Sequence, residues 1–250
     1  MSENNSSLDY ISHEFNKRLN EQYKNKSMQA IKSSTSVDPT GVLLNLYLPF
    51  VFSEYFQTQR IETMLDVGCS VGFISNTIST FVDQLYAFDL SPEAIKIAKE
   101  NAAKTNSNVH YFTANALEPL TSPVIKDLKF DFIIILNLHP FNRNVFSSNH
   151  EATVVQAEAI NQYCALLNEN GILYISHTDG KKQTLNIQEK DLPQGAKLLA
   201  GRMNARLVML LSQVLKRKMG IILILSKILS PLFNLVAPKV DLWVIQKTQK

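Results

Sequence analysis

Apolar and polar positions follow two alternating periods through the middle of the chain. Runs that are rich in apolar residues and of strand length occur at 61–67, 85–88, 109–113, 132–136 and 172–176. Between them, apolar positions recur at helical spacing, at 73–81, 91–103 and 151–167. Apolar runs that alternate with helices are typical of parallel strands buried on both faces. We therefore predict an α/β fold with a doubly wound, mostly parallel sheet.

Both flanks of this core have a different pattern. Residues 1–7 are polar, and we expect them to be disordered. Residues 8–31 alternate charged and apolar positions, and 42–56 is apolar and rich in aromatic residues. These two stretches predict helices. They either simply pack on the sheet or, as the family resemblance given below implies, cover a ligand site. At the other end of the chain, 241–246 predicts a final strand.

Residues 181–239 separate the fifth predicted strand from the last one, which is far longer than an ordinary connection. Its apolar stretches are interrupted by Lys and Arg, and no uninterrupted apolar run reaches the ~18 residues of a membrane-spanning helix. Such stretches suit a helix that lies on a membrane surface or lines a groove for an acyl chain. Helices packed on the sheet or in a dimer interface are the alternative.

These patterns divide the chain into four parts. The expected parts are a helical cap at 1–58, a core at 59–180, a basic and apolar helical insertion at 181–239, and the final strand with its tail at 240–250. A length of 250 residues permits one large domain with additions.

Cysteine content and the N-terminal sequence bear on location. Cys69 and Cys164 are far apart and belong to no CxxC or His cluster, which favours a reducing compartment over a disulfide framework or a zinc site. The first ten residues have neither a basic region nor an apolar core, so we expect no signal peptide. Both observations favour the cytoplasm.

The net charge of +3 is too small to indicate a nucleic-acid partner by itself. Its distribution is uneven, because residues 181–250 carry 13 Lys and Arg against 3 Asp and Glu. That segment has a net charge of +10, and the rest of the chain has −7. The basic character therefore belongs to the C-terminal part.

A turn with two glycines follows the first predicted strand, in the segment Asp66-Val67-Gly68-Cys69-Ser70-Val71-Gly72. Gly68 lets the backbone turn sharply and approach a ligand, and Gly72 lets the start of the next helix pack close to the strand. The N–H groups at that helix start favour an electron-rich ligand group. Asp89 ends the next strand about twenty residues on, where a nucleotide-binding α/β fold has its ribose-binding carboxylate.

Residues 66–72 resemble the D-x-G-x-x-x-G loop of class I S-adenosylmethionine-dependent methyltransferases. They fit the dinucleotide pattern G-x-G-x-x-G less well, because Ser70 stands at its second glycine. Asp66, at the strand end, also suits a donor with a cationic sulfonium and an ammonium group. The resemblance covers 60–180 and 240–247. It implies a seven-stranded Rossmann-like sheet with its last strand antiparallel, and S-adenosylmethionine as cofactor, which leaves as S-adenosylhomocysteine.

The resemblance also implies a set of cofactor-binding residues: Asp66, Gly68, Cys69, Ser70, Gly72, Asp89, Leu90, Asn115, Ala116 and Asn137. The glycine loop would hold the methionine end and Asp89 the ribose hydroxyls, while 90 and 115–116 would contact adenine. Asn115 departs from the family, which has Asp there in many members. Its amide carbonyl can still accept a hydrogen bond from the adenine amino group. Asn137 would lie near the transferred methyl group.

The segment Asn137-Leu138-His139-Pro140-Phe141 follows the fourth predicted strand. An oxygen acceptor benefits from a base, and His139 is our candidate catalytic residue because the ordinary pKa of histidine suits proton removal near neutral pH. A histidine held by backbone groups in a loop is the alternative interpretation. Further candidates to line the pocket are His150 and His177, with Tyr10 and Tyr23 of the cap. No metal-ligand set is expected at any of these positions.

The same segment resembles the (Asp/Asn)-Pro-Pro-(Tyr/Phe) motif of amino-group methyltransferases, but it does not match in detail. Leu138 stands at the polar position of that motif, and Asn137 is one residue too early. An exocyclic amine would therefore lack its hydrogen-bond acceptor. This mismatch disfavours methylation of a nucleic-acid base.

We therefore predict a cytoplasmic S-adenosylmethionine-dependent methyltransferase that methylates an oxygen on a small-molecule or lipid-linked acceptor. One alternative is an RNA or other nucleic-acid methyltransferase. Another is a methyltransferase-like protein that binds a ligand or partner without turnover. Peripheral contact with the inner membrane surface through 205–236, and a homodimer, are the partner interactions left open.

Overall fold

The structure is a computed structural model. It describes residues 61–79, 82–138, 141, 148–177, 185, 187–204, 207–208, 210–211, 215, 219–236 and 241–248. The predicted N-terminal cap at 1–58 lies outside the described residues, as do its candidates Tyr10 and Tyr23.

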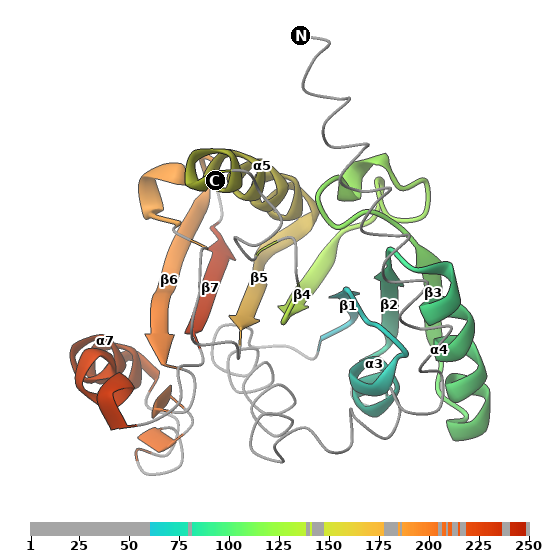
Figure 1. Cartoon of the computed structure of the whole chain (residues 1–250), viewed down its shortest axis with the longest axis horizontal. Helices are drawn as coiled ribbons and strands as arrows, with labels where there is room; N and C mark the ends of the chain where they lie inside the picture. The colour runs from blue at the N-terminus through green and yellow to red at the C-terminus, as the bar shows by residue number, and fades with distance from the viewer. Residues whose placement is uncertain are drawn as a thin grey trace, which may run out of the picture.

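The described residues form a single seven-stranded sheet (Figure 1). Its strands are β1 Thr63–Val67, β2 Gln84–Asp89, β3 Val109–Thr113, β4 Phe130–Leu136, β5 Leu167–His177, β6 Ala196–Asn204 and β7 Asp241–Lys247. Their order is β3-β2-β1-β4-β5-β7-β6. The first five strands pair in parallel, and β7 runs antiparallel to both β5 and β6. The predicted fold class, with its antiparallel last strand, is confirmed.

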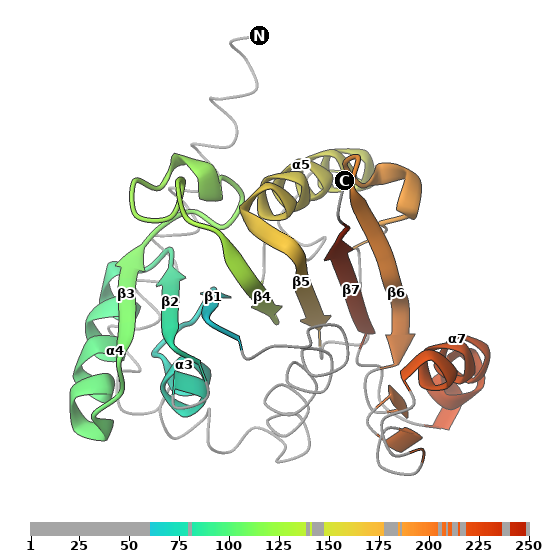
Figure 2. The ribbon, with the colours of Figure 1, turned by 180° about the vertical axis from the view of Figure 1, so that it is seen from behind.

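The described helices cover both faces of this sheet. They are α3 Phe73–Ile78, α4 Pro92–Thr105, α5 Asn149–Leu166 and α7 Met219–Val236, with short 3-10 turns at Pro119–Thr121 and Glu189–Asp191. Figure 2, which shows the molecule from behind, has α5 on one side and α3 and α7 on the other. One core cluster contains Ile78 of α3 and Ile222 of α7, and another contains Ile160 of α5.

Side chains of the central strands alternate between these two clusters, as the pleat requires. Ile134 of β4 packs in the α3 and α7 cluster, whereas Ile133 and Ile135 pack in the α5 cluster. All three have no exposed surface. A strand that buries both of its faces has to be apolar at nearly every position, which explains the Phe-Asp-Phe-Ile-Ile-Ile-Leu sequence of β4.

The termini of α4 follow from its local sequence. The Ser91 hydroxyl accepts a hydrogen bond from the Ala94 N–H, Pro92 occupies the first helical position, and Glu93 lies in the first turn. Asn106 ends the helix in the left-handed conformation. The helix buries Ala94 and Ala98 among other small and aliphatic residues, and it presents its charged residues to solvent.

The start of the fifth strand differs from the prediction. The segment 168–171 was expected to end the helix before the fifth strand, but β5 already begins at Leu167. Leu167 pairs with Phe130, and the next pair is Phe132 with Ile172, so 168–171 is accommodated by a register shift inside the strand.

The larger correction concerns the predicted helical insertion at 181–239. Residues Ala196–Asn204 form the edge strand β6, so this part of the segment belongs to the core sheet. The strand has two register shifts against β7 and carries charged residues, as edge strands often do. The helical prediction is confirmed for Met219–Val236. Within the described part of the chain, no helix has the length and apolar character needed to cross a membrane.

Candidate functional site

The predicted cofactor residues gather at the carboxyl edge of the parallel strands. Asp66 is the penultimate residue of β1 and Asp89 ends β2, while Asn115 follows β3 and Asn137 follows β4. Val67 pairs with both Phe88 and Ile135, so these strand ends are level with one another. Ligands of open α/β sheets bind at this edge. The topology thus brings together four polar residues that are up to 71 positions apart in sequence.

The loop after β1 is held in a tight left-handed path. Gly68, Ser70 and Gly72 have φ values of 75°, 52° and 78°. Ser70 is the unusual member, because residues other than glycine seldom adopt a positive φ. Its N–H donates to Asp89 Oδ2 at 3.0 Å, and this bond holds the loop against the end of β2.

Three N–H groups of the loop that precedes helix α3 have backbone partners. The N–H groups of Gly68 and Cys69 both donate to the Phe88 carbonyl, and that of Gly72 donates to the Cys69 carbonyl. These donors are therefore used within the protein. The short helix α3 has no side-chain cap at its start, and the Asn76 N–H of its first turn donates to the Gly72 carbonyl.

Gly72 is required by its neighbours as well as by its φ. A Cβ atom at this position would overlap the Tyr111 hydroxyl, and it would lie 2.9 Å from Tyr111 Cζ and 3.1 Å from Ala98 Cβ. The close approach is thus to β3 and α4, whereas we expected it to be to the preceding strand. The Tyr111 hydroxyl donates to Asn76 Oδ1 at 2.9 Å, and this contact links β3 to α3.

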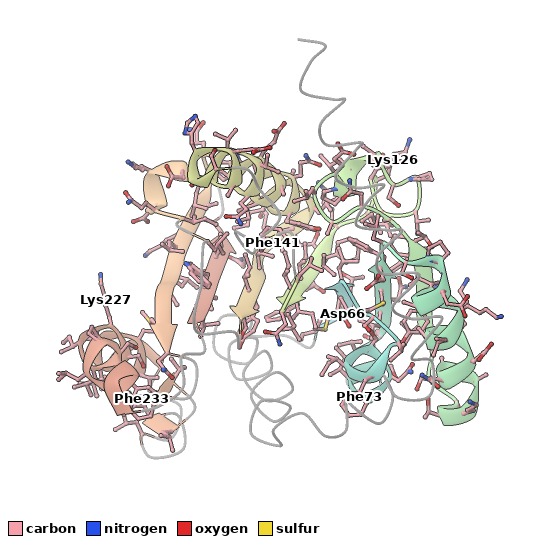
Figure 3. All side chains as sticks on the ribbon, viewed as in Figure 1. Asp66, Phe73, Lys126, Phe141, Lys227 and Phe233 are labelled. Atoms are coloured by element: carbon pink, nitrogen blue, oxygen red, sulfur yellow. The ribbon has the colours of Figure 1, made fainter. Side chains whose placement is uncertain are left out.

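Asp66 is buried and has one short hydrogen bond. Its Oδ2 accepts from the Ser75 hydroxyl of α3 at 2.5 Å. Figure 3 shows Asp66 beside β1, close to α3. Burial raises the pKa of this carboxyl to about 6, opposed by the Ser75 bond and assisted by the negative charge of Asp89. A cationic ligand group beside it would favour the ionised form, so the site is electrostatically suited to a positively charged ligand.

Asp89 is the second buried carboxylate of the site. Oδ2 accepts from the Ser70 N–H, and Oδ1 accepts from the Ser91 N–H at 2.9 Å. Burial raises its pKa, although the backbone hydrogen bonds from Ser91, Ser70 and Leu90 oppose this shift. A carboxylate has about four lone-pair positions, so after these three backbone bonds one is left to accept from a hydroxyl group. This remaining acceptor position fits the ribose contact predicted for Asp89.

The predicted adenine contacts lie next to Asp89. The Asp89 carbonyl accepts from the Ala114 N–H at 3.2 Å, which places Asn115 and Ala116 beside the end of β2. Asn115 Oδ1 accepts from the Leu117 N–H at 3.0 Å, and the Ala116 carbonyl accepts from the Tyr163 hydroxyl at 2.7 Å. The side-chain oxygen Oδ1 of Asn115 therefore has one acceptor position left for an adenine amino group.

The segment after β4 lies against the glycine loop. Asn137 has a φ of 52°, is exposed, and donates its N–H to the Ser176 carbonyl of β5. A Cβ atom at Gly68 would overlap Leu138 Cδ1, so the Leu138 side chain packs directly on the loop backbone. The Phe141 N–H donates to the Leu138 carbonyl, and Figure 3 shows Phe141 on the α5 side of the sheet, where it is buried.

The candidate base His139 lies outside the described residues. His150 is an exposed residue in the first turn of α5. His177 is the last residue of β5, where its backbone pairs with Asp241. Across the described ranges, no three His, Cys, Asp or Glu side chains lie close enough together to hold a metal ion.

The structure adds residues that the sequence analysis did not identify. Ser75 holds Asp66, and Asn101 of α4 donates to the Val71 carbonyl at 3.0 Å. Tyr111 fills the space beside Gly72. Each contacts the glycine loop or its carboxylate from a different element, and none belongs to the loop motif. The polar positions at 75 and 101, on otherwise regular helices, were the only signals in the sequence.

Comparison with known proteins gives a family. The profile of the methyltransferase-domain family matches residues 59–234. In sequence, the chain is 35% identical over 87 residues to release factor glutamine methyltransferase of Aquifex aeolicus, and 31% identical over 94 residues to an uncharacterised RNA methyltransferase of Listeria innocua. Each match covers 32% of this chain, but only 28% of the Aquifex protein and 21% of the Listeria protein.

Similar solved structures share the fold over most of the chain. The plantazolicin methyltransferase BamL, solved with S-adenosylhomocysteine and a substrate analogue, has a TM-score of 0.58 at 16% identity, covering 96% of this chain and 99% of that chain. The [4+2]-cyclase SpnF has a TM-score of 0.51 at 16% identity, covering 81% and 80% of the two chains. The strand order, the carboxyl-edge loop and the family match lead to one conclusion. The chain belongs to the class I methyltransferase family, whose methyl donor is S-adenosylmethionine.

Proposed function

We propose that this protein transfers a methyl group from S-adenosylmethionine to an oxygen atom of a small or lipid-linked acceptor. The observation that carries the proposal is the pair of buried carboxylates, Asp66 and Asp89, which lie at the edge of the sheet and influence each other electrostatically. Two negative groups in a buried site disfavour an anionic ligand and favour a cationic one. When bound, the donor supplies an electrophilic methyl group on a positively charged sulfur.

Within this proposal, different residues at the carboxyl edge of the sheet contact different parts of the donor. The loop 68–72 and Asp66 face the methionine end, Asp89 accepts hydrogen bonds from the ribose hydroxyls, and 115–116 with Leu90 border adenine. Asn137 lies at the end of β4, near the methyl group. His139 would take the proton from the acceptor hydroxyl while the new carbon–oxygen bond forms and the carbon–sulfur bond breaks. The main catalytic contribution of the protein is then the alignment of the acceptor with the methyl group.

Calorimetry with S-adenosylmethionine tests the cofactor site. The Asp89→Ala variant loses a hydrogen bond to a charged acceptor, worth about 1.5–3 kcal/mol, so we expect its affinity to fall about 10- to 150-fold. Asp131→Ala is the matched control. Asp131 also accepts backbone hydrogen bonds, from Glu62 and Thr63, but it lies at the amino end of β4.

The control variant should bind the donor as the wild type does, once circular dichroism has shown that both variants are folded. Equal affinity of wild type and Asp89→Ala would refute the ribose assignment. Equal weakening in both variants would show a general loss of structure instead of a lost contact. Turnover is tested separately with His139→Gln, which should keep donor affinity and lose product formation.

A second candidate function is methylation of RNA. The Listeria relative is named an RNA methyltransferase, and residues 181–250 have a net charge of +10. This function predicts binding to total tRNA that weakens steeply as salt is raised. Binding that is weak and insensitive to salt would remove this candidate.

The proposal includes a cytoplasmic location and peripheral contact with the inner membrane surface through 205–236. Cys69 and Cys164 are both free and buried, in keeping with a reducing compartment. A homodimer through the same range is the competing arrangement.

A further inference from the structure

Helix α7 carries a large apolar surface on the outside. Its large exposed residues are Ile221, Ile224, Ile228 and Leu232, with exposed fractions of 48%, 62%, 63% and 65%. Their spacing of three and four residues places them in one stripe along the helix. Elsewhere among the described residues, large exposed apolar side chains are scattered over several elements, at Phe73, Leu120, Val124, Val154 and Leu210.

The opposite side of α7 faces the protein, and it combines apolar residues with two serines. Ile222, Ser226 and Ser230 are buried there at a spacing of four residues. The Ser230 hydroxyl accepts from the Asn204 N–H at 2.9 Å, which fixes the C-terminal half of α7 to the end of β6. A helix that only covers a sheet exposes polar residues on its outer side. Packing among the described residues therefore does not explain the outward stripe.

The charge around the stripe limits what can cover it. Residues 192–240 contain no Asp or Glu, and their basic residues are Lys197, Arg202, Arg206, Lys216, Arg217, Lys218, Lys227 and Lys239. Lys227 is exposed on α7, and Figure 3 shows it pointing away from the body of the molecule. A second copy of the chain would bring like charges together. An anionic phospholipid surface offers both the apolar layer and the negative charge.

The stripe is also placed at the edge of the sheet that carries the donor site. Backbone pairing puts Leu136 level with Ser176, Ser176 with Leu242, and Leu242 with Met203. Asn204 at the end of β6 is therefore level with Asn137 at the end of β4. Three strand spacings, about 15 Å, separate the two positions across the sheet. Because Ser230 is bound to Asn204, the C-terminal half of α7 lies at this same edge.

We propose that the Ile221, Ile224, Ile228 and Leu232 face of α7 docks on an anionic bilayer. The helix lies in the interface, with its stripe among the acyl chains and its basic neighbours at the headgroups. Docking in this way turns the carboxyl edge of the sheet toward the lipid, so that an acceptor embedded in the bilayer meets the donor site. The choice of acceptor rests on the proposed methyltransferase function. The docking itself does not.

Vesicle flotation tests this face. The probes are vesicles of phosphatidylcholine alone, and vesicles of phosphatidylcholine with phosphatidylserine. The full-length protein should float with the anionic vesicles. The triple variant Ile224→Ser, Ile228→Ser, Leu232→Ser should lose this partitioning by more than about tenfold, because each substitution removes an apolar side chain from the lipid. Lys227→Gln should reduce it about fivefold, with a weaker response to salt.

A matched triple variant keeps the result specific to the stripe. Leu120→Ser, Val124→Ser, Val154→Ser removes as many exposed apolar side chains from other parts of the surface, and it should float like the wild type. Equal flotation of wild type and stripe variant, or no flotation of the wild type with either vesicle, would overturn the proposal. A wild-type dimer that the stripe variant converts to a monomer, without vesicle binding, would assign the face to a second copy instead.

Calorimetry separates this outcome from the cofactor site. The stripe variant should bind S-adenosylmethionine with wild-type affinity, since none of its residues lies among the donor contacts. Loss of flotation with intact donor binding supports the docking face alone. Loss of both would show that the variant is misfolded, and single substitutions at Ile228 and Leu232 then replace it in the same assay.

Discussion

Helices cover the same face of the sheet at its two ends, but they differ in which side chains they expose to solvent. In the donor half, formed by β1 to β3 with α3 and α4, helix α4 buries three alanines and two isoleucines and exposes its lysines. In the outer half, formed by β6, β7 and α7, helix α7 buries one isoleucine and two serines, and it exposes three isoleucines and a leucine. Packing alone explains the sequence of α4, but it does not explain that of α7.

The polar groups of the two halves differ as well. The donor half buries Asp66 and Asp89, which accept hydrogen bonds from Ser70, Ser75 and Ser91. The outer half has no acidic residue between Asp191 and Asp241. The comparison teaches that functional residues are found where packing does not explain the sequence. These are the buried acids in one half and the exposed aliphatic residues in the other. Three substitutions test this contrast.

The largest effect is expected from Gly72→Ala in the donor half. The positive φ of 78° costs about 1–2 kcal/mol for alanine, and overlap with the Tyr111 hydroxyl adds about 1–3 kcal/mol. We expect a loss of about 3 kcal/mol in the free energy of unfolding, measured by urea denaturation. Gly195→Ala is the control in the outer half, with a φ of 83° and no atom within 4 Å of the new Cβ. It should lose only about 1 kcal/mol, and equal losses would remove the role assigned to Tyr111.

Asp66→Asn should stabilise the protein without donor at neutral pH. The pKa of Asp66 is raised from 3.8 to about 6, so the folded protein holds this proton more tightly than the unfolded chain does. Ionisation of Asp66 therefore destabilises the fold as pH rises from 3.8 to about 6, and the full effect, about 3 kcal/mol, is present above that range.

The expected gain from Asp66→Asn is thus up to about 3 kcal/mol at about pH 8, and it shrinks as the pH falls below about 6. Urea denaturation at several pH values measures it. The same variant should bind S-adenosylmethionine more weakly, because a neutral amide replaces a carboxylate beside the cationic donor. A stability gain that is independent of pH would contradict the buried ionised carboxyl. Unchanged donor affinity would contradict its role in the site.

The smallest effect is expected on the outer stripe of α7. Ile228→Ala changes a side chain that is 63% exposed and should alter the free energy of unfolding by less than about 0.5 kcal/mol. Ile222→Ala changes the same residue type at a buried position of this helix, and it should lower the free energy of unfolding by about 2–5 kcal/mol. A large loss from Ile228→Ala would mean that the stripe stabilises the domain itself, and the contrast between α4 and α7 would disappear.

Most of the sheet could be predicted from sequence, because strands buried on both faces have to be apolar throughout. The strand β4 with its three consecutive isoleucines, and β1 at Thr63–Val67, lie where the apolar runs placed them. The edge strand β6 was missed because Lys197, Gly201 and Arg202 interrupt its apolar pattern. Edge strands depend on tertiary pairing more than on local composition.

The site was predictable in its backbone positions but not in its contacts. The spacing from Asp66 to Asp89 follows from a β–α–β unit of ordinary length, so the sequence could place both acids at one edge. The bonds from Ser75 to Asp66 and from Tyr111 to Asn76 depend on how α3 packs between strands. Likewise, the apolar runs predicted a helix at 219–236, but the side that faces solvent is determined by the attachment of Ser230 to β6.

The contact between Leu138 and Gly68 has a consequence for redesign of this enzyme. The leucine side chain rests on the backbone of the first loop, so the segment that follows β4 and the loop that follows β1 form one packed unit. A graft that exchanges the post-β4 segment to alter acceptor choice will loosen the donor loop if it removes this leucine. If Leu138 is retained and only later positions are varied, acceptor choice can be altered without disturbing the loop that binds the donor.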